Sequence, residues 1–401
     1  MSKKKNHGGI FPSPGGHPST DNRNLNYYLE YDIMPGRQNL REGFHLLQQR
    51  AGLFRQLGLP PALLRGRKVL DLGPGDGSNA VFVHRLDPAR HLLVDANSSA
   101  LRATAGRLEA IHSGGYELNA SLIEEFDPQT LFDVVLCEGV IPWGQPEPRP
   151  FLRRVAEWVA PGGVLVITCM DGISMTADML RRLMATCLIE PGSDPREAAR
   201  NLAPLFSRHL VHLADMTKSV EEWILSNLLQ PLVGGPLSID DALEELAFRF
   251  DLLGSSPHFL TDWRWYKSMR GASADNISEM QHRFATERHN LIDYRYVYAP
   301  RSVRDNERLA AACEALCQQV LAFAEAPGTE ALQEIESLLG ELVREVESFG
   351  SGTAHAMSAF HRGLALFREE GRFPEMPEFD AWFGRTQQHA SFLARDLLPG
   401  I

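Results

Sequence analysis

Short apolar runs alternate with amphipathic helical stretches between residues 67 and 170. Apolar runs interleaved with helices are typical of parallel strands whose connecting helices cover both faces of one sheet. Two later runs, at 248–256 and 291–299, are predicted to complete that sheet. The pattern therefore predicts an α/β fold with a seven-stranded sheet. The five earlier runs read KVLDLG, HLLVDAN, YELNASL, FDVVLCEG and GGVLVITCM.

The segments around these strands predict the remaining organisation. Residues 1–24 are rich in Lys, Gly, Pro, Ser and Asn, so we expect a disordered arm there, followed by an N-terminal helical cap at 25–66. The core is predicted at 67–300, with a helical insertion at about 172–246 that covers one end of the sheet as a lid. Apolar positions at steps of three and four predict a C-terminal helical bundle at 301–401, either a structural appendage or a dimer surface.

Composition and charge narrow the classes of protein. Hydrophobic residues make up 44% of the chain and charged residues 23%, as in soluble globular proteins. The net charge of -11 argues against broad affinity for nucleic acid. No apolar run approaches the roughly 20 residues of a membrane helix, and no signal peptide follows the first lysines, so a cytoplasmic protein without a membrane partner is expected. The five cysteines lack zinc-site spacing, and no metal site is predicted.

Candidate chemistry begins in the stretch VLDLGPGDGSNA at 69–80, where three glycines alternate after the first strand. Glycine tolerates the backbone angles of a tight turn and lets a ligand approach the main chain. A dinucleotide-binding fingerprint needs its third glycine one position later, where Ser78 stands. An oxidoreductase that uses a nicotinamide cofactor is therefore disfavoured.

The acid two positions before the first glycine, followed by G-x-G-x-G, resembles motif I of the Rossmann-like (class I) S-adenosylmethionine-dependent methyltransferases. Asp71, Gly73, Gly75 and Gly77 match that motif residue by residue. Asp95, at the end of the second run, is placed to accept hydrogen bonds from both ribose hydroxyls, although an acid there also fits NAD. The resemblance covers 67–170 well and 248–299 loosely, and it implies S-adenosyl-L-methionine as the cofactor.

The same resemblance implies further cofactor contacts. Ser121 and Leu122 fall where family members place the adenine, and Glu138 with Gly139 begins the loop that borders the transferable methyl group. The complete set of predicted cofactor-binding residues is Asp71, Gly73, Pro74, Gly75, Gly77, Asp95, Ala96, Ser121, Leu122, Glu138 and Gly139.

The loop after the fourth strand argues against nucleic-acid substrates. Amino methyltransferases of nucleic acids carry [DNS]-P-P-[FYW] there, and residues 139–143, GVIPW, hold only a distorted version of it. Many small-molecule enzymes of this kind have a His in this loop, and here Trp143 and Gly144 occupy the region. The easiest choice of general base is therefore missing.

Two aromatic segments are candidates for the substrate side. NYYLEYDIMPGR holds Tyr27, Tyr28, Tyr31 and Arg37, which either cover a ligand or pack at a domain edge. SSPHFLTDWRWYK places His258 beside an acid and several aromatic residues, so His258 is either a general base or a structural histidine. Trp143 is also predicted on the substrate side. The site residues predicted for substrate and catalysis are thus Tyr27, Tyr28, Tyr31, Arg37, Trp143 and His258.

Two functions of different kinds fit these features. The first is a methyltransferase that acts on a small molecule through an oxygen or nitrogen acceptor. The second is a catalytically degenerate member of the same fold that serves as a binding or scaffold subunit, with the C-terminal helices as its interaction surface or as a homodimer contact. The intact Asp71, Asp95 and three glycines favour the enzyme. A chain that ends near Arg304 is expected to keep a cofactor-binding sheet.

Overall fold

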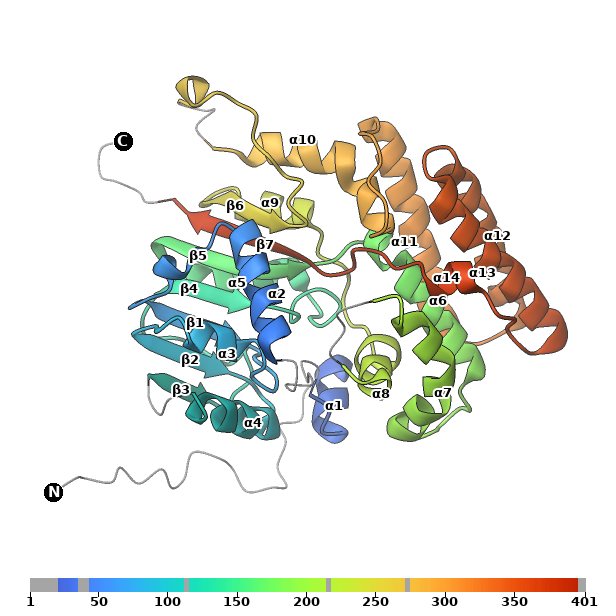
Figure 1. Cartoon of the computed structure of the whole chain (residues 1–401), viewed down its shortest axis with the longest axis horizontal. Coiled ribbons are helices and arrows are strands. Elements are labelled where there is room, and N and C mark those ends of the chain that lie inside the picture. The colour runs from blue at the N-terminus through green and yellow to red at the C-terminus, as the bar shows by residue number, and fades with distance from the viewer. Residues whose placement is uncertain (1–20, 35–42, 112–114, 214–217, 271–274, 396–401) are drawn as a thin grey trace.

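A mixed seven-stranded sheet organises the chain (Figure 1). A computed structural model describes residues 21–34, 43–111, 115–213, 218–270 and 275–395. Neighbouring strands follow the order β3-β2-β1-β4-β5-β7-β6, and β7 is antiparallel to both of its neighbours. The strands are β1 Lys68–Leu72, β2 Arg90–Val94, β3 Tyr116–Asn119, β4 Phe132–Cys137, β5 Val159–Cys169, β6 Phe250–Ser256 and β7 Gln388–Ala394.

The apolar runs predicted the first six strands correctly. β1 to β5 coincide with the five runs between 67 and 170, and they pair in parallel, as the interleaved helices indicate. β6 coincides with the run at 248–256. The α/β prediction is confirmed, and so is a helical insertion between β5 and β6, which runs from the start of α6 at Gly172 to the end of α9 at Leu246.

The predicted strand at 291–299 is wrong, and the seventh strand lies at 388–394 instead. Residues Arg288–Ile292 form a 3-10 helix, and residues 293–299 belong to none of the strands of the sheet. The buried Asp293 accepts a hydrogen bond from Thr353 (2.8 Å), and Tyr298 shares a hydrogen bond with the same hydroxyl (2.7 Å). This segment therefore packs against α13 and does not pair in the sheet.

Helices cover both faces of the sheet and extend beyond the carboxyl ends of its parallel strands. Figure 1 shows α1 and α8 beyond those ends, and α11 to α13 farther from the sheet. The helices are α1 Arg23–Glu30, α2 Gly43–Gln56, α3 Ala80–His84, α4 Ser98–Glu109, α5 Pro148–Glu157, α6 Gly172–Leu188, α7 Pro195–Leu210, α8 Val220–Ile224, α9 Ile239–Leu246, α10 Ile277–Glu287, α11 Val303–Glu325, α12 Thr329–Glu347, α13 Ser351–Glu370 and α14 Pro377–Asp380.

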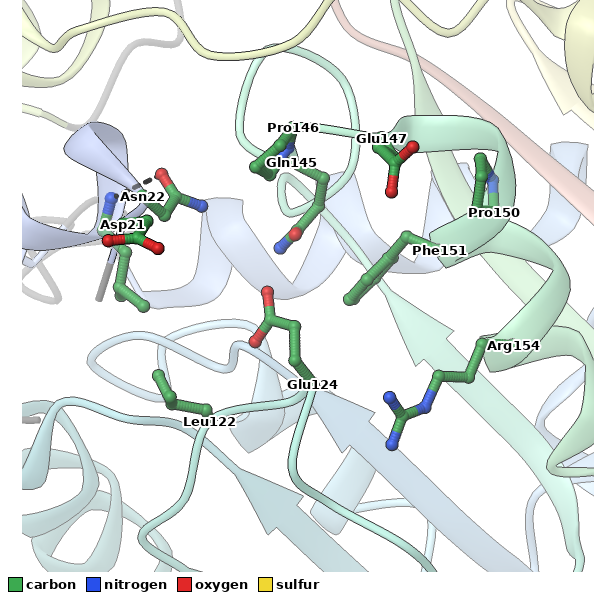
Figure 2. Close-up of a pocket in the computed structure, with 11 residues that line it drawn as sticks. Asp21, Asn22, Leu122, Glu124, Gln145, Pro146, Glu147, Pro150, Phe151 and Arg154 are labelled. Carbon is green, nitrogen blue, oxygen red and sulfur yellow. Dashed lines mark hydrogen bonds between the residues drawn. The ribbon is translucent and has the colours of Figure 1, made fainter. Parts of the chain in front are cut away.

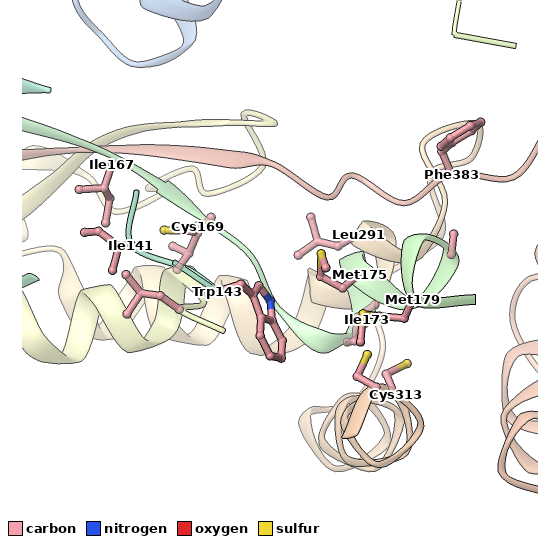
Figure 3. Packing of buried hydrophobic residues seen from close by; sticks show 14 of the residues in the cluster. Ile141, Trp143, Ile167, Cys169, Ile173, Met175, Met179, Leu291, Cys313 and Phe383 are labelled. Atoms are coloured by element: carbon pink, nitrogen blue, oxygen red, sulfur yellow. The ribbon is translucent and has the colours of Figure 1, made fainter. Parts of the chain in front are cut away.

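The C-terminal helices share one core with the sheet. A single cluster of buried apolar residues includes Ile167 of β5, Ile173 of α6, Cys313 of α11 and Phe383 of the segment that leads to β7 (Figure 3). The prediction of a purely helical region at 301–401 is therefore wrong in one respect, because this region also supplies the interior strand β7.

The first helix begins inside the segment that was expected to be a disordered arm. Asn22 caps α1, because its side-chain oxygen accepts hydrogen bonds from the backbone N–H groups of Asn24 and Leu25. Residues 1–20 lie outside the described part of the chain, so only 21–24 of the predicted arm are described, and they are ordered around this cap.

Candidate active site

The turn after β1 requires glycine at its three alternate positions. Gly73, Gly75 and Gly77 all have left-handed backbone angles, with φ of +68°, +58° and +77°. A Cβ on Gly73 would lie 2.6 Å from Val140, and a Cβ on Gly77 would lie 2.8 Å from the Cα of Thr104. The turn thus packs directly against the loop after β4 and against α4.

Asp95 joins this turn to the end of β2. Its carboxylate accepts hydrogen bonds from the backbone N–H groups of Gly75 (3.2 Å) and Asn97 (2.8 Å). Burial raises the pKa of Asp95 to about 6, although those two N–H donors oppose the increase by favouring the charged form. The carboxylate can accept further hydrogen bonds, so it suits the ribose hydroxyls that the family resemblance places here.

A cavity of about 130 Å³ opens over the turn, and we call it the cofactor cavity. Segments from the ends of four parallel strands and from α1 meet around it. This is the edge at which open α/β sheets bind ligands. The predicted site residues that line the cofactor cavity are Gly73, Gly75, Asp95, Ala96, Leu122, Gly139 and Tyr28.

The other predicted cofactor residues are not part of this lining. The carboxylate of Asp71 is buried, 3.8 Å from the Nε2 atom of His91. The hydroxyl of Ser121 is buried and has no hydrogen-bond partner within the described ranges. The predicted residues outside the lining are Asp71, Pro74, Gly77, Ser121 and Glu138.

Glu138 forms a buried ion pair that sequence reasoning missed. Arg50 of α2 binds both of its carboxylate oxygens, at 3.1 Å and 2.9 Å, and the two side chains are only 6% and 13% exposed. Burial alone would raise the pKa of Glu138, but the charges of Arg50 and His389 and the hydrogen bond from Arg50 together outweigh burial, so the pKa lies below its ordinary value. Because Gly139 follows directly and donates its N–H to Thr168 (2.9 Å), the pair anchors the loop at the cofactor cavity.

We expect Arg50→Met to destabilise the fold by about 3–5 kcal/mol, because it leaves the carboxylate of Glu138 buried without its counterion. Chemical denaturation measures this change. The double variant Arg50→Met/Glu138→Gln should recover part of the loss. Arg23→Met is the matched control, since Arg23 pairs with Glu325 at the surface, where the two side chains are 64% and 68% exposed. This variant should lower the free energy of unfolding by less than about 1 kcal/mol. Equal effects of the two single variants would contradict the expectation.

The three predicted tyrosines lie on or just after α1 but have different surroundings. Tyr28 lines the cofactor cavity and donates its hydroxyl to Gln230. Tyr27 is buried and donates its hydroxyl to the backbone oxygen of Leu225 (3.2 Å), and the ring of Tyr31 packs against that of Tyr27. Burial raises the pKa of both Tyr27 and Tyr28, so these phenols act as donors that join α1 to the helical insertion.

Two further predicted residues, Trp143 and His258, do not line the cofactor cavity, and a third falls outside the described part of the chain. Arg37 lies outside the described residues. Trp143 packs in the main core cluster and not on the lining, with φ of +59°, and its backbone N–H bonds Gly235 (2.9 Å). His258 follows the edge strand β6, and its side chain is exposed and away from the cofactor cavity. The structure therefore brings neither Trp143 nor His258 to the cofactor.

Asn22 and Gln145 line the cofactor cavity although no sequence signal pointed to them. Asn22 donates its side-chain N–H to the backbone oxygen of Gly144 (2.7 Å), which holds the start of α1 against the loop after β4. This contact between segments far apart in the sequence helps to bring the two residues to one cavity. The capping preference of Asn22 was the single local clue that a helix begins there.

Two other features of the described chain bear on the type of site. Within the described ranges, no three His, Cys, Asp or Glu side chains are grouped so that they could hold a metal ion. Among the helices of the described residues, none is both long enough and apolar enough to span a bilayer.

Comparison with protein families identifies the part of the chain that surrounds the cavity. Residues 70–165 match a family described as a methyltransferase domain. The matched segment runs from β1 into β5 and so contains the glycine turn, Asp95 and the loop after β4. The match confirms the resemblance stated from the motifs, and with it S-adenosyl-L-methionine as the cofactor. No curated protein matches the chain.

Solved structures that resemble the chain include PKMT2 from Rickettsia typhi, at 20% identity and a TM-score of 0.40, over 60% of this chain and 50% of that one. The chain thus aligns with half the length of that protein. The N-methyltransferase NodS from Bradyrhizobium japonicum, in complex with S-adenosyl-L-homocysteine, matches at 17% identity and a TM-score of 0.31, over 36% of this chain and 74% of NodS. An S-adenosylmethionine-dependent methyltransferase from Mesorhizobium loti matches at 22% identity and a TM-score of 0.26, over 30% of this chain and 54% of its own.

Proposed function

We propose that this chain, which carries a Rossmann-like (class I) S-adenosylmethionine-dependent methyltransferase domain, methylates a small-molecule acceptor at an oxygen or nitrogen atom. The observation that supports the proposal is the convergence of the glycine turn, Asp95 and the loop after β4 on one cavity. A protein that used this fold only as a scaffold would not need to retain these residues together.

The side chains around the cofactor cavity fit a reaction that depends on positioning. The bound cofactor supplies an activated methyl group, so the protein has to orient the acceptor and exclude water. Asp95 holds the ribose, and the anchored loop at Gly139 sets one wall of the reaction space. Tyr28 of α1 covers the opposite side and is tied to the helical insertion by Gln230.

A small acceptor fits the way in which α1 covers this edge. Asn22 and Asn24 bind the backbone oxygens of Gly144 and Pro231 at 2.7 Å and 2.8 Å, so α1 is tied to two separate loops above the sheet. A polymeric substrate would have to displace these contacts. The net charge of -11 also disfavours a nucleic acid.

The C-terminal helices offer less support for the scaffold alternative. The apolar stripes that suggested a dimer surface are buried within the chain, since Leu309 and Leu316 of α11 and Phe360 of α13 are fully covered. The stripes therefore do not need a second protomer to bury them. We propose the enzyme as the primary function.

Calorimetry with S-adenosyl-L-homocysteine and NADH tests this proposal. The native chain should bind S-adenosyl-L-homocysteine and not NADH. Gly75→Val should abolish that binding, because Gly75 lines the cavity at a positive φ and its N–H must reach Asp95. Gly162→Val is the control, since Gly162 has a similar φ of +69° with no atom near its Cβ position and lies away from the cavity. Wild-type affinity in Gly75→Val, or a preference for NADH, would refute the proposal.

A further inference from the structure

A second cavity of about 490 Å³ adjoins the cofactor cavity, and we call it the side cavity (Figure 2). It lies between the start of α1, the loop after β3 and the start of α5. A molecule in the side cavity would therefore border the cofactor. The residues that line both cavities are Asn22, Leu25, Leu122, Glu124 and Gln145.

The lining of the side cavity is strongly acidic. Asp21, Glu124 and Glu147 contribute three carboxylates, and none of them forms an ion pair with a described residue. Among the described residues of the lining, the one cation is Arg154, whose guanidinium already donates to the backbone oxygen of Phe126 (3.1 Å) and lies over the ring of Trp158. The lining therefore favours a positively charged ligand.

Gln145 gives an independent indication that a polar ligand binds here. Its side chain is only 7% exposed, yet its amide hydrogen-bonds to none of the described residues. Figure 2 shows this amide directed into the cavity, toward the carboxylate of Glu124. Because this largely covered amide faces the cavity and makes no hydrogen bond to a described residue, the arrangement suits a ligand group that hydrogen-bonds to Gln145.

Apolar side chains complete the lining. Phe151 of α5 is 8% exposed, and Figure 2 shows its ring directed into the cavity. Leu25 and Leu122 line the wall that the two cavities share. The side cavity thus combines an apolar surface large enough for an aromatic ring with carboxylates around it.

We infer that the side cavity is the acceptor subsite and that the acceptor is an amine with an apolar body. The ammonium group lies among Asp21, Glu124 and Glu147, and the body packs on Phe151. The ammonium first loses a proton to solvent; the nitrogen lone pair then forms a bond to the methyl carbon while the carbon–sulfur bond breaks. The bonding pair stays on sulfur, which leaves a neutral thioether and a methylated ammonium. This inference rests on the proposed methyl transfer.

Binding to the protein saturated with S-adenosyl-L-homocysteine tests the inference. The probes are 2-phenylethylamine, 2-phenylethanol and 3-phenylpropionate, which share a ring and differ in charge, and saturation-transfer NMR titration measures each. We expect the amine to bind tightest and the carboxylate weakest. The double variant Asp21→Asn/Glu147→Gln should weaken amine binding by about three-fold to ten-fold, the effect of two solvent-screened ion pairs. Its affinity for S-adenosyl-L-homocysteine should not change, because neither residue lines the cofactor cavity.

Glu157→Gln is the control, since Glu157 is an exposed acid at the far end of α5 and lines neither cavity. Failure of the native chain to bind S-adenosyl-L-homocysteine would overturn the proposed function itself. If that binding is intact, equal affinity for the three probes, or an unchanged amine affinity in the double variant, overturns the amine subsite alone. Weaker binding of S-adenosyl-L-homocysteine to the double variant would assign the side cavity to the cofactor and also overturn the inference.

Discussion

Removal of residues 305–401 is expected to abolish folding of the whole chain and not to release an intact cofactor-binding sheet. β7 lies between β5 and β6 and pairs with both, so its loss separates β6 from the sheet and leaves β5 with an unpaired edge. The buried Phe392 and the apolar face of α11 are lost as well. The stabilising free energy lost with several such buried groups exceeds the free energy of unfolding of a typical domain, roughly 5–15 kcal/mol. Circular dichroism and thermal melting should show no cooperative transition.

Point substitutions in β7 test the same reasoning without a truncation. Phe392→Ala should destabilise the chain by about 3–5 kcal/mol, because the side chain is fully buried between the sheet and its helices. Leu393→Ala, at the next position, should have a much smaller effect, since Leu393 is 37% exposed. A soluble product of residues 1–304 that melts cooperatively and binds S-adenosyl-L-homocysteine would show that β7 is dispensable.

Asp95→Ala is expected to weaken S-adenosyl-L-homocysteine binding by about 3 kcal/mol or more, more than a hundred-fold. A charge-assisted hydrogen bond contributes about 1.5–3 kcal/mol, and two ribose hydroxyls would lose their acceptor. The variant also removes the hydrogen bonds to Gly75 and Asn97 that hold the turn. Isothermal titration calorimetry measures the change. Glu117→Gln on β3 is the control, because Glu117 pairs with Arg90 at the surface and its side chain is 54% exposed.

The same carboxylate makes cofactor binding depend on pH. The pKa of Asp95 is raised to about 6 in the free protein, and ribose hydroxyls donate to the ionised form, so binding lowers this pKa. The affinity for S-adenosyl-L-homocysteine should be highest above pH 6 and should fall as the pH drops through about 6. Binding near pH 6 should release a proton. Asp95→Asn should lose this dependence. A pH profile identical in Asp95→Asn and the native chain would exclude Asp95 as its source.

Local spacing predicted the glycine turn after β1, because all determinants of its backbone conformation lie close together in sequence. The positive φ angles of Gly73, Gly75 and Gly77 follow from a tight turn between β1 and α3, and the alternation of the glycines already indicates that turn. Asp95 comes directly after β2, so local spacing also placed it at the strand end that borders this turn. Each of these features belongs to a single strand and the turn that follows it.

The prediction of the seventh strand failed because the same alternating sequence pattern can pack against a helix or pair with a strand. The alternating run at 291–299 resembles a strand, but Asp293 and Tyr298 pack against Thr353 of α13. The true seventh strand was read as part of a helical region, because pairing with β5 and β6 determines its conformation. Trp143 carries an aromatic ring like the residues of many binding sites, yet the loop turns it into the core.

The sequence by itself determined the α/β class, the first six strands, the helical insertion and the tight glycine turn after β1, because apolar periodicity and glycine spacing act within a few residues. Only the tertiary structure decided which segment completes the sheet and which side chains surround the two cavities. Asn22, Arg50 and Gln145 reach their positions through contacts with segments far away in the chain, such as the bond from Asn22 to Gly144 and the pair of Arg50 with Glu138. Such contacts depend on burial and on long-range hydrogen bonds that form only when the whole chain has folded.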